Sequence, residues 1–125
     1  LLFISVLMCS LTSLVARVEA QPDRATMVRD IGTAAVGSGP QGFTAVETSA
    51  GARVYFAART KGIGTEPWSS DGTAAGTRSL GDLAPGPEGS FPIQFVAAED
   101  LVYFATRPSL GNGIQVWSTA GTPQS

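Results

Sequence analysis

Carboxylates are the side chains with which this chain could do acid–base chemistry, because its 125 residues include no histidine. Without histidine there is no Ser–His–Asp triad, no Cys–His pair and no histidine metal site. A glycosidase mechanism needs two carboxylates on either side of a cleft at a defined separation. From residue 21 onward the acidic residues are Asp23, Asp30, Glu47, Glu66, Asp71, Asp82, Glu88, Glu99 and Asp100. Their spacing singles out no pair, so we predict no catalytic residue and no enzymatic activity.

Asp71 has the most suitable setting for a divalent cation. Calcium takes about six to eight oxygen ligands, usually from a loop dense in Asp, Asn and Gly. Asp71 is close in sequence to the hydroxyls of Ser69, Ser70 and Thr73. It is the single carboxylate of that loop, and one carboxylate rarely suffices for calcium. We therefore predict no cofactor and no metal site, and retain Asp71 as the calcium candidate.

The charge pattern does not indicate a nucleic-acid partner. The chain has 8 basic and 10 acidic residues and a net charge of −2, so it offers no basic surface to phosphates. Its basic residues are scattered and do not alternate with aromatic ones, as single-strand binding would require. The glycine pairs in Gly62-Ile63-Gly64 and Gly111-Asn112-Gly113 lack the context of a phosphate-binding loop, and they predict hairpin loops instead.

The first twenty residues differ in composition from the rest. They are mainly apolar, they end at Ala20, and the polar run Gln21-Pro22-Asp23 follows. This pattern is typical of a secretory signal peptide, so we expect cleavage after Ala20 and a secreted or cell-surface protein. The chain begins with Leu and lacks a basic stretch before the apolar run, so we expect the true start to be missing. Membrane attachment through an uncleaved residue 1–20 segment is the alternative.

An internal repeat covers most of the remaining chain. Four segments recur in the same order at offsets of 47 to 52 residues: Asp30-Ile31 as Asp82-Leu83, Gly39–Gly42 as Gly86–Gly89, Val54–Ala57 as Val102–Ala105, and Trp68–Thr73 as Trp117–Thr122. Self-similarity at such a period indicates one supersecondary unit per repeat. We predict two units, approximately residues 26–76 and 77–122.

Each unit contains four short β-prone runs between loops rich in Gly and Pro. The runs are Thr26–Ile31, Phe43–Glu47, Arg53–Ala58 and Thr65–Ser69, and then Thr77–Leu83, Phe91–Ala97, Leu101–Ala105 and Ile114–Ser118. No stretch after residue 21 has a sustained helical period, so little helix is expected. Four strands in about 40–50 residues is the size of one propeller blade. The predicted fold is all-β, with about two propeller-like blades of antiparallel strands.

Two blades do not close a propeller, which typically has about 4–8. We therefore expect residues 21–125 to be a fragment of a longer array. The alternative is a short protein that assembles with other copies.

The segment Thr65–Thr77 resembles the ELWxxDGTxxGT repeat of secreted bacterial proteins, some of which are called hyalin-like. Pro67 replaces the Leu of that motif, and the second copy departs further, with Gln115 for Glu66 and Ala120 for Asp71. The resemblance covers about residues 26–122. It implies an extracellular or cell-surface β-repeat protein with many tandem copies, with no general enzymatic activity and no agreed ligand.

Recurrence in a repeat favours a structural role for the motif residues, because an enzyme needs one site and not one per blade. Asp71-Gly72 suits a tight turn, and the hydroxyls of Thr73 and Thr77 can cap it. The motif residues to which we assign structural roles are Glu66, Trp68, Asp71, Gly72, Thr73, Gly76, Thr77, Trp117, Gly121 and Thr122.

The expected function is that of a non-catalytic, secreted or cell-surface scaffold or binding module. Extracellular proteins and glycans are the candidate partners, and recognition would occur on loops. A second hypothesis is an accessory propeller module of a larger secreted enzyme, such as a hydrolase, whose catalytic part is not in this chain. A third is a purely structural array without a ligand.

Overall fold

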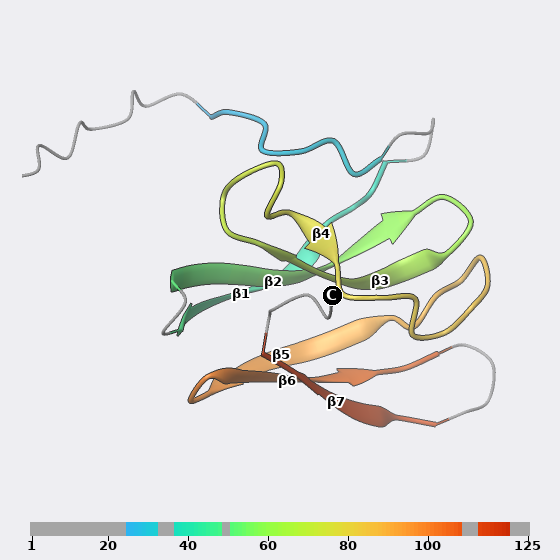
Figure 1. The fold of residues 1–125 in the computed structure, drawn as a ribbon. Coiled ribbons are helices and arrows are strands. Elements are labelled where there is room, and N and C mark those ends of the chain that lie inside the picture. The colour runs from blue at the N-terminus through green and yellow to red at the C-terminus, as the bar shows by residue number, and fades with distance from the viewer. Residues whose placement is uncertain (1–24, 33–36, 49–50, 109–112, 121–125) are drawn as a thin grey trace, which may run out of the picture.

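The residues that the structure describes form seven β-strands in two antiparallel sheets (Figure 1). The structure, a computed structural model, describes residues 25–32, 37–48, 51–108 and 113–120. The first sheet has the order β1-β2-β3-β4 and the second β5-β6-β7. The strands are β1 (Gln41–Thr48), β2 (Gly51–Thr60), β3 (Gly64–Ser70), β4 (Arg78–Ser79), β5 (Pro92–Ala98), β6 (Leu101–Thr106) and β7 (Gln115–Thr119).

The all-β prediction is confirmed: the described residues contain strands and turns and no helix. The second, third and fourth β-prone runs of each unit correspond to β1, β2 and β3 and to β5, β6 and β7. These runs are rich in β-branched and aromatic residues, which fit a pleated and half-buried surface. The two sheets do not close into a ring. The expected signal peptide, residues 1–20, lies outside the described residues.

The first run of each unit differs from the prediction. Residues 26–31 form no strand, and within 77–83 only the two residues of β4 pair, with Trp68 and Ser69 of β3. Arg29 extends instead toward the turn after β3, where its guanidinium donates to the carbonyl oxygen of Thr77 at 2.6 Å. A β-prone run becomes a strand only where a sheet edge is open to it, and local sequence does not show that edge.

Equivalent residues are paired in the two sheets, and the first strand of each sheet has an irregularity at the equivalent position. In the first sheet Tyr55 pairs with Thr44 and Ser69, and in the second Tyr103 pairs with Val96 and Ser118. Both outer strands shift register over two residues, Gly42 and Phe43 in β1 and Gln94 and Phe95 in β5.

Each irregularity presents a phenylalanine to the middle strand. Phe43 stacks on Phe56 with ring centroids 5.2 Å apart, and Phe95 stacks on Phe104 at the same distance. Positive φ angles at Gly42 (69°) and Gln94 (55°) accompany the two register shifts. In space, β1 therefore corresponds to β5 with an offset of 52 residues. The sequence similarity between Gly39–Gly42 and Gly86–Gly89 has an offset of 47, and it does not match this structural correspondence because Gly89 lies before β5.

The main core lies between the two sheets. Its buried members are Val46, Tyr55, Phe95, Val102 and Phe104, with Leu80, Leu83 and Trp117 packed against them. A second cluster covers the opposite face of the first sheet, where Ile31 and Val54 pack against Phe56, Ala58 and Trp68. Neighbouring residues of β2 thus serve different clusters, as the two-residue period of a strand requires. Figure 1 shows the residue 25–32 segment on the side of the first sheet away from the second.

The connection from β4 to β5 touches the first sheet at a point where only glycine fits. Thr65 of β3 bridges to Gly89, its N–H donates to the Glu88 carbonyl at 3.0 Å, and its carbonyl accepts from Phe91 at 3.1 Å. A Cβ on Gly89 would overlap the Thr65 backbone, and one on Gly64 would overlap the backbone of Glu88 and Gly89. The absence of both side chains lets the connection run against β3.

Replacing Gly89 with Ala should therefore lower the free energy of unfolding for two reasons: the unfavourable positive φ and the overlap of the added Cβ with the Thr65 backbone. Gly62 is the matched control: its φ is 90°, against 81° for Gly89, but nothing lies within 4 Å of its added Cβ. Gly62→Ala should cost about 1 kcal/mol from the left-handed conformation, and Gly89→Ala at least about 2 kcal/mol. Urea unfolding measures both, and equal losses would contradict the close approach.

Candidate functional site

The most buried polar cluster of the described chain is centred on Glu66 in β3. The side chain of Glu66 is fully buried and accepts three hydrogen bonds. Its Oε1 accepts from the Ser90 N–H at 2.9 Å, and its Oε2 accepts from the Ser90 hydroxyl at 2.7 Å and the Leu83 N–H at 3.1 Å. A buried carboxylate is costly unless its oxygens are hydrogen-bonded, so these donors make its position tenable.

Ser90 carries this contact on to the second sheet. Its N–H and hydroxyl are bonded to Glu66, while its carbonyl accepts from the N–H of Arg107, just after β6, at 2.9 Å. Leu83, the other residue bonded to Glu66, packs its side chain against the core between the sheets. The cluster is therefore a mechanical link between the two sheets. Its oxygens face the chain's own donors, and this arrangement does not suit a general acid or base, which must reach a substrate proton.

The corresponding position of the second sheet lacks this link. Gln115 pairs with Thr106 as Glu66 pairs with Ala58, but Gln115 is exposed. The two tryptophans differ in a related way. The indole N–H of Trp117 donates to the Thr106 hydroxyl at 2.9 Å, whereas the buried indole N–H of Trp68 has no hydrogen-bond partner among the described residues. Ala58 stands where an acceptor like Thr106 would be.

Asp71 organises the turn that follows β3. Its Oδ1 accepts from the Thr73 N–H at 2.9 Å and from the Thr73 hydroxyl at 2.7 Å. The Thr73 hydroxyl oxygen accepts from the Gly76 N–H at 2.9 Å, and the Thr77 hydroxyl donates to the Thr73 carbonyl at 2.7 Å. Gly72 adopts a positive φ of 86°.

Gly76 lies against the Asp71 side chain in the same turn. A Cβ there would overlap the carboxylate, so a side chain at residue 76 would displace that carboxylate from its present position. The motif residues from Asp71 to Thr77 thus form one turn closed by the chain's own hydrogen bonds, whereas Gly121 and Thr122 lie outside the described residues.

Hydrogen bonds hold the pKa of Asp71 below its ordinary value of 3.8. The Thr73 hydroxyl contributes most and the Thr73 backbone N–H next, because both donate to the ionised form. The carboxylate is exposed, and in the part of the chain that the structure describes no three His, Cys, Asp or Glu residues gather as a metal site would need. Asp71 thus supplies one carboxylate whose Oδ1 already accepts two bonds, and this set does not fit the ligand number of calcium.

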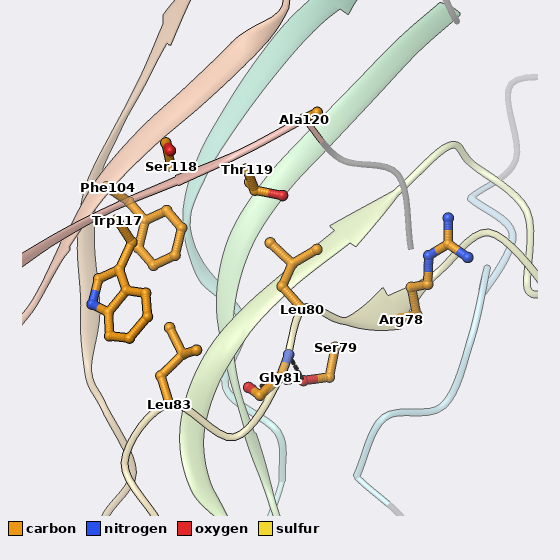
Figure 2. A pocket seen from close by; sticks show the side chains of 10 residues that line it. All are labelled: Arg78, Ser79, Leu80, Gly81, Leu83, Phe104, Trp117, Ser118, Thr119 and Ala120. Carbon is orange, nitrogen blue, oxygen red and sulfur yellow. Dashed lines mark hydrogen bonds between the residues drawn. The ribbon is translucent and has the colours of Figure 1, made fainter. Parts of the chain in front are cut away.

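A cavity of about 490 Å³ lies between the β4–β5 connection and the second sheet. Figure 2 shows Leu80 and Leu83 pointing toward Phe104 and Trp117, while Arg78 points away from them. The volume suits a small ligand. Arg78 is the one charged residue of the lining, and no carboxylate belongs to it, so the cavity has no acid–base pair.

Sequence reasoning singled out Glu66 but not its partners Ser90 and Leu83. Ser90 follows directly after the Gly86–Gly89 segment, so the recurrence of that segment was the available signal. Among the residues that the structure describes, no helix is long and apolar enough to cross a membrane.

Comparison with known proteins gives no relative from which to transfer a function. No family model matches the chain, and neither the curated proteins nor the solved structures contain a match to it.

Replacing Glu66 with Gln should lower the free energy of unfolding by about 1–3 kcal/mol, because the amide leaves a buried donor of Ser90 or Leu83 unpaired. Gln115→Ala is the control at the corresponding, exposed position and should cost less than about 0.5 kcal/mol. Urea unfolding measures both variants. Wild-type stability in Glu66→Gln would show that the buried link does not hold the sheets.

Replacing Thr73 with Val should raise the pKa of Asp71 toward its ordinary value, because the main hydrogen-bond donor is lost. Thr73→Ser keeps the hydroxyl and should keep the low pKa. The folded-state pKa is depressed, so the turn's contribution to stability is present above the unfolded pKa and is lost as the pH falls through the folded one. An NMR pH titration of the Asp71 carboxyl carbon measures the effect, and identical midpoints in wild type and Thr73→Val would contradict it.

Proposed function

We propose that the chain is a non-catalytic β-repeat module of a secreted or cell-surface protein, serving as a rigid scaffold for recognition. The observation that carries this proposal is the use of its motif side chains. Glu66, Asp71, Thr73 and Thr77 are all hydrogen-bonded to nearby backbone or to one another. Side chains committed in this way position backbone and do not face a reacting substrate.

The resemblance to ELWxxDGT repeats supports the same proposal from the sequence. A protein of that kind would be exported, with residues 1–20 as its signal, and its sheets would be blades of a propeller-like array. Recognition of an extracellular protein or glycan would then use the loops, as in other rigid β scaffolds. The turn at residues 71–76 is one such loop, since its residues 71–75 are exposed while its backbone is held by hydrogen bonds.

The test compares turnover with folding. Wild type, Glu66→Gln and Asp71→Asn are assayed on chromogenic glycosides, esters and phosphate esters, and each variant's melting temperature is recorded. We expect the same background rate for all three proteins on every substrate, and lower melting temperatures for the variants. A hydrolysis rate that disappears in Asp71→Asn while the melting temperature is unchanged would overturn the proposal.

A further inference from the structure

The outer face of the second sheet is apolar and exposed. Val102 and Phe104 of β6 are buried against the first sheet, so the residues that alternate with them point the other way. We name this outer surface the Tyr103 face; it consists of Ile93, Val96, Tyr103, Ala105, Val116 and Ser118. Val116 is 76% exposed and Tyr103 is 40% exposed. A contiguous apolar surface of this kind typically marks an interaction site.

The Tyr103 face repeats, position by position, a surface that the molecule already uses to hold a sheet. The first sheet packs on the second through Tyr55, which is fully buried, and through Val46. Strand registers align the two surfaces: Thr44 with Val96, Tyr55 with Tyr103, Ala57 with Ala105, Pro67 with Val116, and Ser69 with Ser118. The tyrosine, the alanine and the serine are retained, so the second sheet presents a second receiving surface.

The other half of that interface also has a second copy in the molecule, on the outer side of the first sheet. The partner of Tyr55 in the core is the stacked pair Phe95–Phe104, of which Phe95 is only 7% exposed. The first sheet carries the corresponding pair Phe43–Phe56 on its outer side, and there Phe43 is 61% exposed. We name this surface the Phe43 face; it consists of Phe43, Val54, Phe56 and Trp68. Phe56 and Trp68 are already buried, at 5% and 6% exposed, so Phe43 is the exposed part of this face.

The chain segment that precedes each sheet is arranged in the same way. Leu83 precedes the second sheet and packs into the cluster that holds Phe104 and Trp117. Ile31 precedes the first sheet and packs onto Phe56 and Trp68. The Phe43 face thus has the same preceding segment packed on it as the face of the second sheet that packs on Tyr55.

We propose that the Tyr103 face of one copy of this chain binds the Phe43 face of a second copy, head to tail, in the manner in which its own two sheets pack. The two faces lie on opposite ends of the stack of sheets, so each copy has one of each and the contact is heterologous. Such a contact generates a ring or an open chain of copies, depending on whether the rotation closes. The occupant is a second copy because its Phe43 face matches the surface that already packs on Tyr55.

Two variants that each block one face provide the test. Phe43→Glu and Val116→Glu place the same charge on opposite faces, at exposed side chains, so circular dichroism should show wild-type folding. Sedimentation velocity of the full chain at about 100 µM measures the assembly. The wild type should sediment above twice the monomer mass of 12.8 kDa, and each variant alone should be monomeric.

The mixture of the two variants is the decisive sample. Each variant retains the face that the other lacks, so an equimolar mixture should form a one-to-one dimer and stop there. Ala75→Glu, with the same charge in the exposed turn, should assemble as the wild type does. A monomeric wild type, a Val116→Glu variant that assembles as the wild type, or a mixture that stays monomeric would each overturn the proposal.

Discussion

The buried carboxylate of Glu66 is the interaction on which the arrangement of the two sheets depends. Through this side chain β3 is bonded to the connection that leads into the second sheet. Glycines at positions 64 and 89 bring that connection close enough for the bonds to form. Ser90 then passes the constraint to Arg107 after β6. Burial of apolar surface in the core between the sheets favours their packing, and the bonds to Glu66 fix the path of the β4–β5 connection.

Glu66 and Asp71, the two motif carboxylates, are both bonded within the chain. Asp71 is bonded to Thr73 in its own turn, whereas Glu66 accepts from Leu83 and Ser90 of the β4–β5 connection, 17 and 24 residues along the chain. Asp71 accepts from Thr73 and packs its carboxylate against Gly76, so the turn that follows β3 is compact. Both carboxylates thus hold backbone segments in place through bonds within the chain.

Six β-prone runs were predicted correctly as strands, but the partners of these strands were not predicted. The runs are rich in β-branched and aromatic residues, which suit a strand whether its outer face is covered, as in the first sheet, or exposed, as in the second. The run at 26–31 did not form a strand: its Ile31 packs on the face of the first sheet that carries Phe56 and Trp68, a long-range contact that the local pattern does not contain. The bond from Ser90 to Glu66 joins residues 24 apart. The register shifts at Gly42 and Gln94 could not be predicted either, because the correspondence of these two residues is visible only in the strand pairing. The Asp71 turn, by contrast, is closed by near neighbours, and its residue types predict it.

Amide hydrogen exchange at Ser90 measures whether the Glu66 link holds the two sheets together in solution. The N–H of Ser90 lies in an irregular connection, and its hydrogen-bond acceptor is the buried Glu66 carboxylate. The account predicts that this amide exchanges as slowly as the paired amides of β2, and that it opens only when the two sheets separate. Exchange at the rate of an exposed loop, with β2 still protected, would show that the link between the sheets does not exist in solution.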